Sequence, residues 1–176
     1  GKIQLNSGVY DQEKSIAGMD VNERTGSNYP SRVEGIPVGR RCQSIHFLHS
    51  CRWGRAEVGE MVATYVVHYE DGNFEEVPVI YGKDMMDFWV GSDARYQLQG
   101  LSHVAWLQNS KTPWGSIQLL LTRQSWPNPH PEKTITHIDF VSAGKKAAPF
   151  LVGITVEQAS AIGSGANASL PPESRD

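Results

Sequence analysis

The fold class of this chain is decided by one stretch, Met61-Val-Ala-Thr-Tyr-Val-Val-His-Tyr-Glu-Asp-Gly-Asn-Phe-Glu-Glu-Val-Pro-Val-Ile-Tyr81. Two runs rich in β-branched and aromatic residues flank a short polar turn, Glu70-Asp71-Gly72-Asn73. Asp-Gly between such runs is a strong hairpin signal, because glycine adopts positive φ without a Cβ clash. The stretch therefore predicts an antiparallel hairpin that pairs Met61–Tyr69 with Phe74–Tyr81.

Segments of the same kind recur on both sides of the hairpin. Within Gln43 to His49, for example, Ile45, Phe47 and His49 alternate with more polar residues, which places them on one face of a strand. Further strands are expected at Arg32 to Val38, His103 to Leu107, Ser116 to Arg123, Thr134 to Val141 and Phe150 to Val156. The prolines of Gln124 to Lys133 predict a stiff loop instead. We therefore predict an all-β chain folded as an antiparallel β-sandwich.

Composition divides the chain into three parts. Residues 31–157 carry the strand pattern and are expected to form one sandwich domain, because 176 residues suit a single core. Residues 1–30 are polar and irregular, with a first strand at either Lys2 to Leu5 or Met19 to Val21. Residues 158–176 are small and polar, which predicts a flexible linker or tail. The abrupt start at Gly1 favours a module trimmed of its leader.

Charge and hydropathy exclude two classes of partner. The net charge of -3 gives no sign of nucleic acid or an anionic membrane surface as a partner. No run of apolar residues is long enough to cross a bilayer.

Cys42 and Cys51 flank a predicted strand, which would hold their Cα atoms roughly 30 Å apart. A disulfide needs less than about 7 Å, so two free thiols are expected.

Strand parity predicts where the loops lie. If successive strands run from end to end, Ser50 to Gly59, Gly82 to Leu101 and Gln124 to Lys133 share one end of the sandwich. The Asp71-Gly72 turn then lies at the other end. The candidate binding residues gathered by this prediction are Trp53, Trp89 and Trp126, with Arg52, Arg55, Asp93, Arg95, Asn128 and His130.

These residue types suit a carbohydrate ligand. A pyranose packs its C–H face on an indole ring, while its hydroxyls require charged or amide groups at fixed positions. Loops held by a rigid scaffold are the usual place for such a site. The alternative is that the three tryptophans cover the open end of the sandwich core.

We identify no catalytic constellation. No spacing marks an acid and a base among Asp84, Asp87, Asp93, Glu132 and Asp139. The six histidines are scattered, and His46 and His49 point to opposite faces of their strand, so no metal site and no cofactor are expected. A structural calcium ion at Asp20, Asn22 and Glu23 is an alternative to simple solvation of these side chains.

Four segments carry a family resemblance: Ile36-Pro37-Val38-Gly39-Arg40, Ile45 to His49, Trp126 to Lys133, and Ile138 to Ala143. They resemble bacterial β-sandwich modules of the galactose-binding-like, jelly-roll type, which accompany extracellular or periplasmic polysaccharide-processing proteins. The resemblance runs from Ile36 to Glu157. It implies a non-catalytic carbohydrate-binding module of a secreted bacterial protein, joined covalently to a catalytic domain.

The leading hypothesis is that the module targets an attached enzyme to a polysaccharide or oligosaccharide through its loop-borne tryptophans. The second is a structural or protein-interaction sandwich that docks on a neighbouring catalytic domain. The third is an enzyme, such as a polysaccharide lyase or hydrolase, that uses a carboxylate from the Gly82 to Leu101 segment.

Overall fold

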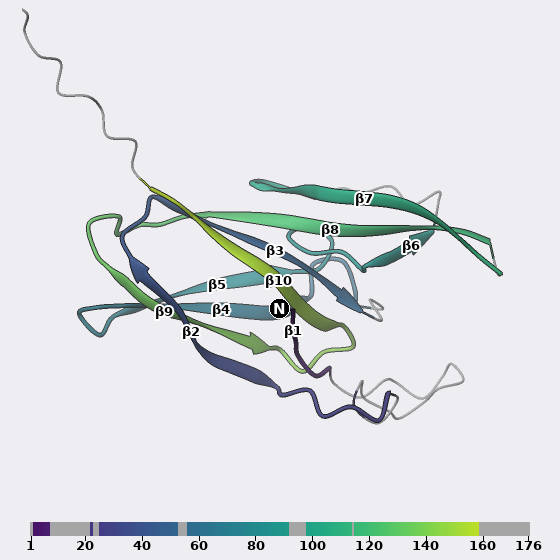
Figure 1. Cartoon of the computed structure of the whole chain (residues 1–176), viewed down its shortest axis with the longest axis horizontal. Coiled ribbons are helices and arrows are strands. Elements are labelled where there is room, and N and C mark those ends of the chain that lie inside the picture. Colours follow the sequence, from purple (N-terminus) through teal and green to yellow (C-terminus); the bar gives the residue numbers. More distant parts are fainter. Residues whose placement is uncertain are drawn as a thin grey trace, which may run out of the picture.

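Two antiparallel sheets face each other in the structure, a computed structural model (Figure 1). The structure describes residues 2–7, 22, 25–52, 56–91, 98–113 and 115–158. The predicted all-β sandwich is confirmed. The stretch that would hold the alternative first strand, Met19 to Val21, lies outside the described residues, as does the predicted tail from residue 159 onward.

Sheet A has the strand order β1-β10-β3-β8-β6, with β7 on the other edge of β8. Its strands are β1 (Ile3–Gln4), β3 (Ser44–Arg52), β6 (Trp89–Gly91), β7 (Ser102–Thr112), β8 (Gly115–Pro127) and β10 (Ala148–Glu157). The β7–β8 hairpin reaches beyond the ends of β4 and β5 (Figure 1).

Sheet B has the order β2-β9-β4-β5. Its strands are β2 (Arg32–Arg40), β4 (Met61–Tyr69), β5 (Phe74–Ile80) and β9 (Ile135–Ser142). The hairpin predicted from the sequence is confirmed as β4 and β5, and Gly72 in its turn has a φ of 84°. Pro37 lies on the edge strand β2, as expected for a residue without an N–H to donate.

A bulge interrupts the predicted alternation of β9. His137 pairs with His68 and Ile135 pairs with Tyr69, so that Thr136 is the extra residue. Simple alternation would place Ile135 on the same face as His137. The bulge turns Ile135 into the core beside Ile138 and Phe140, while His137 stays on the outer face.

The structure refines two predicted segments. Gly82 to Leu101 holds a short element of its own, because β6 lies inside it and pairs with β8. The proline-rich loop is shorter than predicted, because β8 continues as far as Pro127, which pairs with Ser44. Pro127 ends its strand, where a missing N–H costs little.

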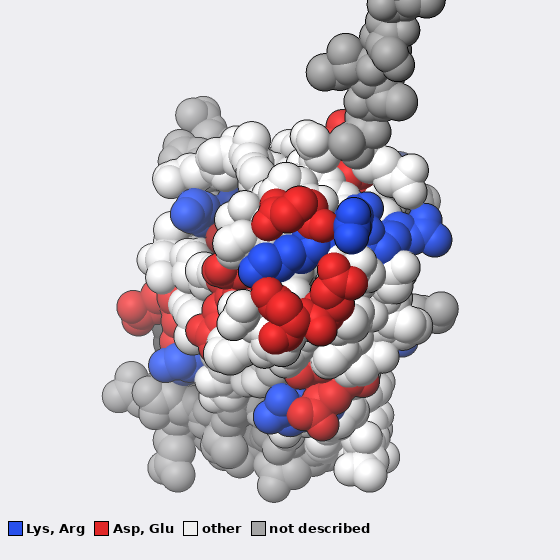
Figure 2. Space-filling view, turned by 90° about the vertical axis from the view of Figure 1, so that its left-hand side faces the viewer, with Lys and Arg blue, Asp and Glu red and all other residues white. Residues whose placement is uncertain are grey.

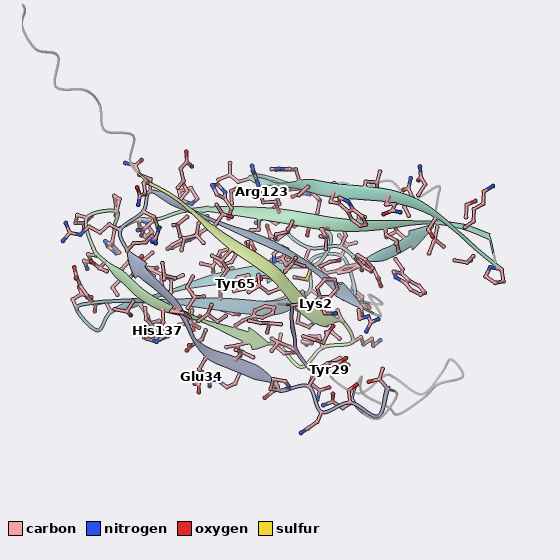
Figure 3. The ribbon with its side chains drawn as sticks, in the orientation of Figure 1. Lys2, Tyr29, Glu34, Tyr65, Arg123 and His137 are labelled. Atoms are coloured by element: carbon pink, nitrogen blue, oxygen red, sulfur yellow. The ribbon has the colours of Figure 1, made fainter. Side chains whose placement is uncertain are left out.

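Aromatic stacking fills the centre of the sandwich. Tyr65 of β4 stacks on Phe47 of sheet A with ring centroids 3.9 Å apart. Its other neighbour is Phe140 of β9, at 4.7 Å. All three rings are fully buried, and Tyr65 lies between the two sheets in Figure 3. Large aromatic rings from both sheets therefore form the middle of one continuous core.

A chain of buried polar groups also joins the sheets. The Tyr65 hydroxyl lies 3.0 Å from His49 Nδ1, and His49 Nε2 lies 3.1 Å from the carbonyl oxygen of Asp84. A carbonyl only accepts, so Nε2 carries the proton and Nδ1 accepts from Tyr65. The Asp84 carboxylate accepts hydrogen bonds from Ile80 N–H and the Ser102 hydroxyl. These bonds fix the segment that enters β6 and the first residue of β7.

Both cysteines are free and buried, as predicted from the strand between them. Burial raises the pKa of Cys51 well above its ordinary value, so the thiol stays protonated at neutral pH.

The buried His49 predicts a loss of stability in acid. Burial lowers its pKa to about 4, whereas an unfolded histidine titrates near about 6.5. Between these values the unfolded chain binds more protons, so stability falls as the pH drops through this window. From pH 7 to 4.5 the free energy of unfolding should fall by about 2–3 kcal/mol more in the wild type than in His49→Gln. Urea denaturation of both proteins at the two pH values measures the difference, and equal losses would contradict the prediction.

Candidate functional site

One of the three loops does not lie at the end that parity predicts. The described parts of Ser50 to Gly59 and the start of Gly82 to Leu101 do meet, since Gly59 N–H donates to Tyr81 O and Phe88 N–H donates to Cys51 O.

The proline-rich loop lies elsewhere. Lys133 Nζ lies 2.7 Å from Asp71 Oδ2, which places the proline-rich loop beside the Asp71-Gly72 turn. Backbone hydrogen bonds support this placement, because Glu70 N–H donates to Thr134 O. The prediction that these two loops lie at opposite ends is therefore wrong. The assumed end-to-end alternation fails because β6 and β7 both pair antiparallel with β8 and therefore run in the same direction.

Charges of both signs cover this end of the molecule (Figure 2). Besides Lys133 and Asp71, Arg41 lies 3.9 Å from Glu70 and His130 lies 3.5 Å from Glu75. The hydrogen bond from Lys133 lowers the pKa of Asp71 to about 2. These charged groups therefore already pair with one another at this end.

The tryptophans Trp89 and Trp126 lie at opposite ends of sheet A. Trp126 pairs with Ile45 at the start of β3. Trp89 follows Phe88, whose N–H donates to the carbonyl of Cys51 near the end of β3. A strand rises about 3.3 Å per residue, so these two places on β3 are about 20 Å apart. The expected meeting of these two rings does not occur.

Trp126 and Asn128 are built into the sandwich. Trp126 packs against the hydrophobic core, as the alternative interpretation of the tryptophans expected. Asn128 Oδ1 accepts from the Tyr69 hydroxyl and from His130 N–H, while its Nδ2 donates to the carbonyls of Cys42 and His130. The Asn128 side chain has no hydrogen-bonding capacity left for a sugar. Its assignment to a binding site is corrected to a cross-link between β4, the β3 entry and the proline-rich loop.

The remaining predicted residues are divided between the two ends and the undescribed segments. His130 lies at the charged end, while Arg52 ends β3 near Trp89. Trp53, Arg55, Asp93 and Arg95 lie outside the described residues, as do Asp20 and Glu23 of the calcium alternative.

An apolar groove lies on the outer face of sheet A. It has a volume of about 420 Å³ and is lined by Lys2, Leu48, Arg52, Phe88, Trp106, Leu121, Phe150 and Val152. Concave sites of a few hundred Å³ suit small ligands or single sugar units. The lining comes from segments far apart in the sequence: from β3, β7, β8 and β10, and from Lys2 and Phe88, which directly precede β1 and β6.

Three aromatic rings form the groove's platform. Phe88 and Trp106 are nearly parallel, with an interplanar angle of 9° and centroids 6.4 Å apart. Phe150 meets Phe88 edge-on at 5.7 Å. Trp106 leaves 40 % of its surface exposed, so the platform is open to solvent. Parallel rings with open faces suit the C–H face of a pyranose.

Two cations border the same groove. Lys2 lies over the Phe150 ring, with Nζ 4.6 Å from the centroid, beside β10 (Figure 3). Partial burial, and then the positive charge of Arg52, lower the pKa of Lys2. The two like charges repel each other, so a bound anion between them would be favourable.

A second cluster lies on sheet B. His68, His137 and Asp139 bring potential metal-ligand atoms within 4.8 Å of one another. The sequence does not reveal this cluster, because His68 and His137 meet only through the pairing of β4 with β9. The local signal was the His137-x-Asp139 spacing, which places two ligand types on one face of a strand.

The sequence pattern places Trp106 in a strand but does not mark it as a candidate binding residue. Nothing local distinguishes it from a core residue. Its neighbour Phe88 reaches it only because β6 and β7 both pair with β8.

No protein-family model matches this chain, and no curated protein or solved structure matches it either. Among the described residues, no helix has the length and apolar character needed to span a membrane.

Asn128 is expected to be essential for stability. Asn128→Ala removes four side-chain hydrogen bonds and leaves the buried Tyr69 hydroxyl without its acceptor. The free energy of unfolding should fall by about 2–4 kcal/mol. The exposed Asn109, which bonds only to Gln118 among the interactions described, supplies the control. Asn109→Ala should change stability by less than about 0.5 kcal/mol. Similar urea midpoints for both variants would contradict the assignment.

Proposed function

We propose that this chain is a non-catalytic carbohydrate-binding module that holds its ligand in the apolar groove of sheet A. The observation that carries the proposal is the open platform of Phe88 and Trp106 with Lys2 and Arg52 at its border. Aromatic faces bind the apolar side of a sugar ring, and the cations would bind acidic substituents. The ligand class is therefore a polysaccharide that carries carboxylate or sulfate groups, and the setting is extracellular or periplasmic.

We also propose that the sandwich is a jelly roll, and the strand order supports this fold. With β6 and β7 set aside, sheet A reads β1-β10-β3-β8 and sheet B reads β2-β9-β4-β5. Successive strands thus alternate between the sheets except at the β4–β5 hairpin. Jelly rolls combine two such sheets through Greek-key connections. On this reading, β6 and β7 are an insertion that extends sheet A and supplies Trp106 to the groove.

Trp106→Ala tests the location of the site. Losing the indole face should weaken binding to polygalacturonate or alginate about tenfold or more, since about 1.4 kcal/mol corresponds to a factor of ten. The melting temperature should change little, because the ring is already 40 % exposed. Affinity electrophoresis in native gels that contain each polymer measures the change.

Trp89→Ala is the matched control, because Trp89 is 60 % exposed but does not line the groove. It should bind like the wild type. If Trp89→Ala loses affinity and Trp106→Ala keeps it, the groove is the wrong site. If the wild type binds no polymer of the panel, the proposed function itself fails.

Lys2→Gln tests the preference for acidic glycans. It should weaken binding to alginate while leaving binding to a neutral galactomannan unchanged, because only the acidic polymer offers a partner for the ammonium group. Added salt should reduce the difference between wild type and variant. An equal effect on both polymers would contradict the acidic preference.

Protein docking is the second candidate function, and the exposure of β7 favours it. Trp106 and Leu107 are exposed neighbours on a strand whose hairpin extends past the sandwich (Figure 1). Apolar side chains on both faces of one strand are more typical of an interface than of a glycan site. Leu107→Asp discriminates the two, since it should abolish docking to an attached catalytic domain but leave glycan binding intact.

A further inference from the structure

Three chemically active side chains converge on sheet B, on the face that points away from the core. His68 of β4 lies directly opposite His137 of β9, and Asp139 follows two residues later on β9. The same strands turn Val67, Ile138 and Phe140 into the core. In Figure 3, His137 lies on the lower sheet, the one opposite the sheet that carries Arg123. The cluster is therefore separate from the groove of sheet A.

The three side chains are already close together. The His68 and His137 rings stack with centroids 4.3 Å apart and an interplanar angle of 10°. His68 Nε2 lies 3.0 Å from Asp139 Oδ2. One ligand atom from each residue lies within 4.8 Å of the other two. Small side-chain rotations would bring these atoms to the ligand separations of a bound metal ion.

Thr136 fixes the orientation of His137. Its hydroxyl donates to the carbonyl of His68 at 3.1 Å, which uses its single proton. The 2.9 Å contact between Thr136 Oγ1 and His137 Nδ1 therefore has Nδ1–H as the donor. In the neutral ring the lone pair is then on Nε2, where it is available to a metal ion. An outer hydrogen bond of this kind is typical of metal-binding histidines.

Gly35 orients Asp139 in the same way. The register of β2 shifts between Val33 and Ile36, and Gly35 adopts a φ of 72° at this bulge. Its N–H is thereby free to donate to Asp139 Oδ1 at 2.9 Å. Only Oδ2 then faces His68, so each carboxylate oxygen has a separate partner. Asp139 is also mostly buried, which limits the orientations that it can adopt.

We propose that His68, His137 and Asp139 form a binding site for a divalent transition-metal ion, Zn²⁺ in the first place. Two imidazole nitrogens and one carboxylate oxygen are ligands that Zn²⁺ prefers, whereas Ca²⁺ and Mg²⁺ require more oxygen atoms. On binding, the ion takes the place of the proton between His68 Nε2 and Asp139 Oδ2, and the neutral His68 ring carries its proton on Nδ1 instead. The position on an open sheet face leaves a fourth coordination site to water or to a carboxylate of a ligand.

Arg32 competes with the ion. Its Nη2 lies 3.8 Å from Asp139 Oδ2 and 2.7 Å from Glu34 Oε1. The guanidinium is half-exposed, so it can keep its bond to Glu34 while the carboxylate of Asp139 turns to the ion. Removing Arg32 should therefore strengthen metal binding, whereas a cluster with a purely structural role would show no such gain.

The experiment is a calorimetric titration of the full chain, free of any purification tag, with Zn²⁺ at pH 7.5. One ion per chain is expected, with micromolar or tighter affinity, and Mg²⁺ should not bind comparably. His137→Gln and Asp139→Asn should each weaken Zn²⁺ binding about tenfold or more. Arg32→Ala should strengthen it several-fold. Circular dichroism shows whether each variant is folded.

His103→Gln is the matched control, because this exposed histidine lies on β7 of the other sheet. It should bind Zn²⁺ like the wild type. The proposal is overturned if the wild type binds no Zn²⁺, or if folded His137→Gln and Asp139→Asn bind it as well as the control. Weaker or unchanged binding by Arg32→Ala would equally contradict the arrangement, and that variant leaves all three ligands in place.

Discussion

The hydrogen-bonded chain from Tyr65 through His49 to Asp84 and Ser102 is the constraint on which the rest of the structure depends. It crosses the interior from sheet B to sheet A, where each unpaired polar group would cost about 1–3 kcal/mol. All of its members must therefore keep their partners, and they can do so in one arrangement of the sheets. The stacked rings around Tyr65 add apolar burial to the same place.

The surface groove follows from this interior constraint. Asp84 is held by Ile80 N–H and by Ser102, so the segment that follows it returns to the end of β3. There Phe88 N–H bonds to Cys51 O, and the ring reaches the outer face beside Trp106. A buried carboxylate thus determines where an exposed aromatic platform forms. The position of the groove on sheet A is thus linked to the hydrogen bonds of the interior.

The inner faces of both sheets pack into the same core, whereas their outer faces differ in chemistry. Sheet A presents apolar rings bordered by Lys2 and Arg52, which suits an acidic glycan. Sheet B presents His68, His137 and Asp139, which suits a metal ion. A strand that buries every second residue leaves the alternate ones to function. The bulges at Thr136 and Gly35 then change which side chains of β9 and β2 point outward.

The sequence by itself determined the features that depend on local backbone chemistry. Turn chemistry predicts the Asp71-Gly72 hairpin, and period-two alternation predicts the inward face of Ile45, Phe47 and His49. The missing N–H of proline predicts the edge position of Pro37, and the length of the strand between the cysteines predicts the free thiols. Only the tertiary structure decided which strands became neighbours. The common direction of β6 and β7, both antiparallel to β8, put the proline-rich loop at the end opposite to the prediction, and the β4–β9 register brought His68 to His137. Strand pairing is set by burial over the whole sandwich, and such long-range packing leaves no mark in the spacing of nearby residues.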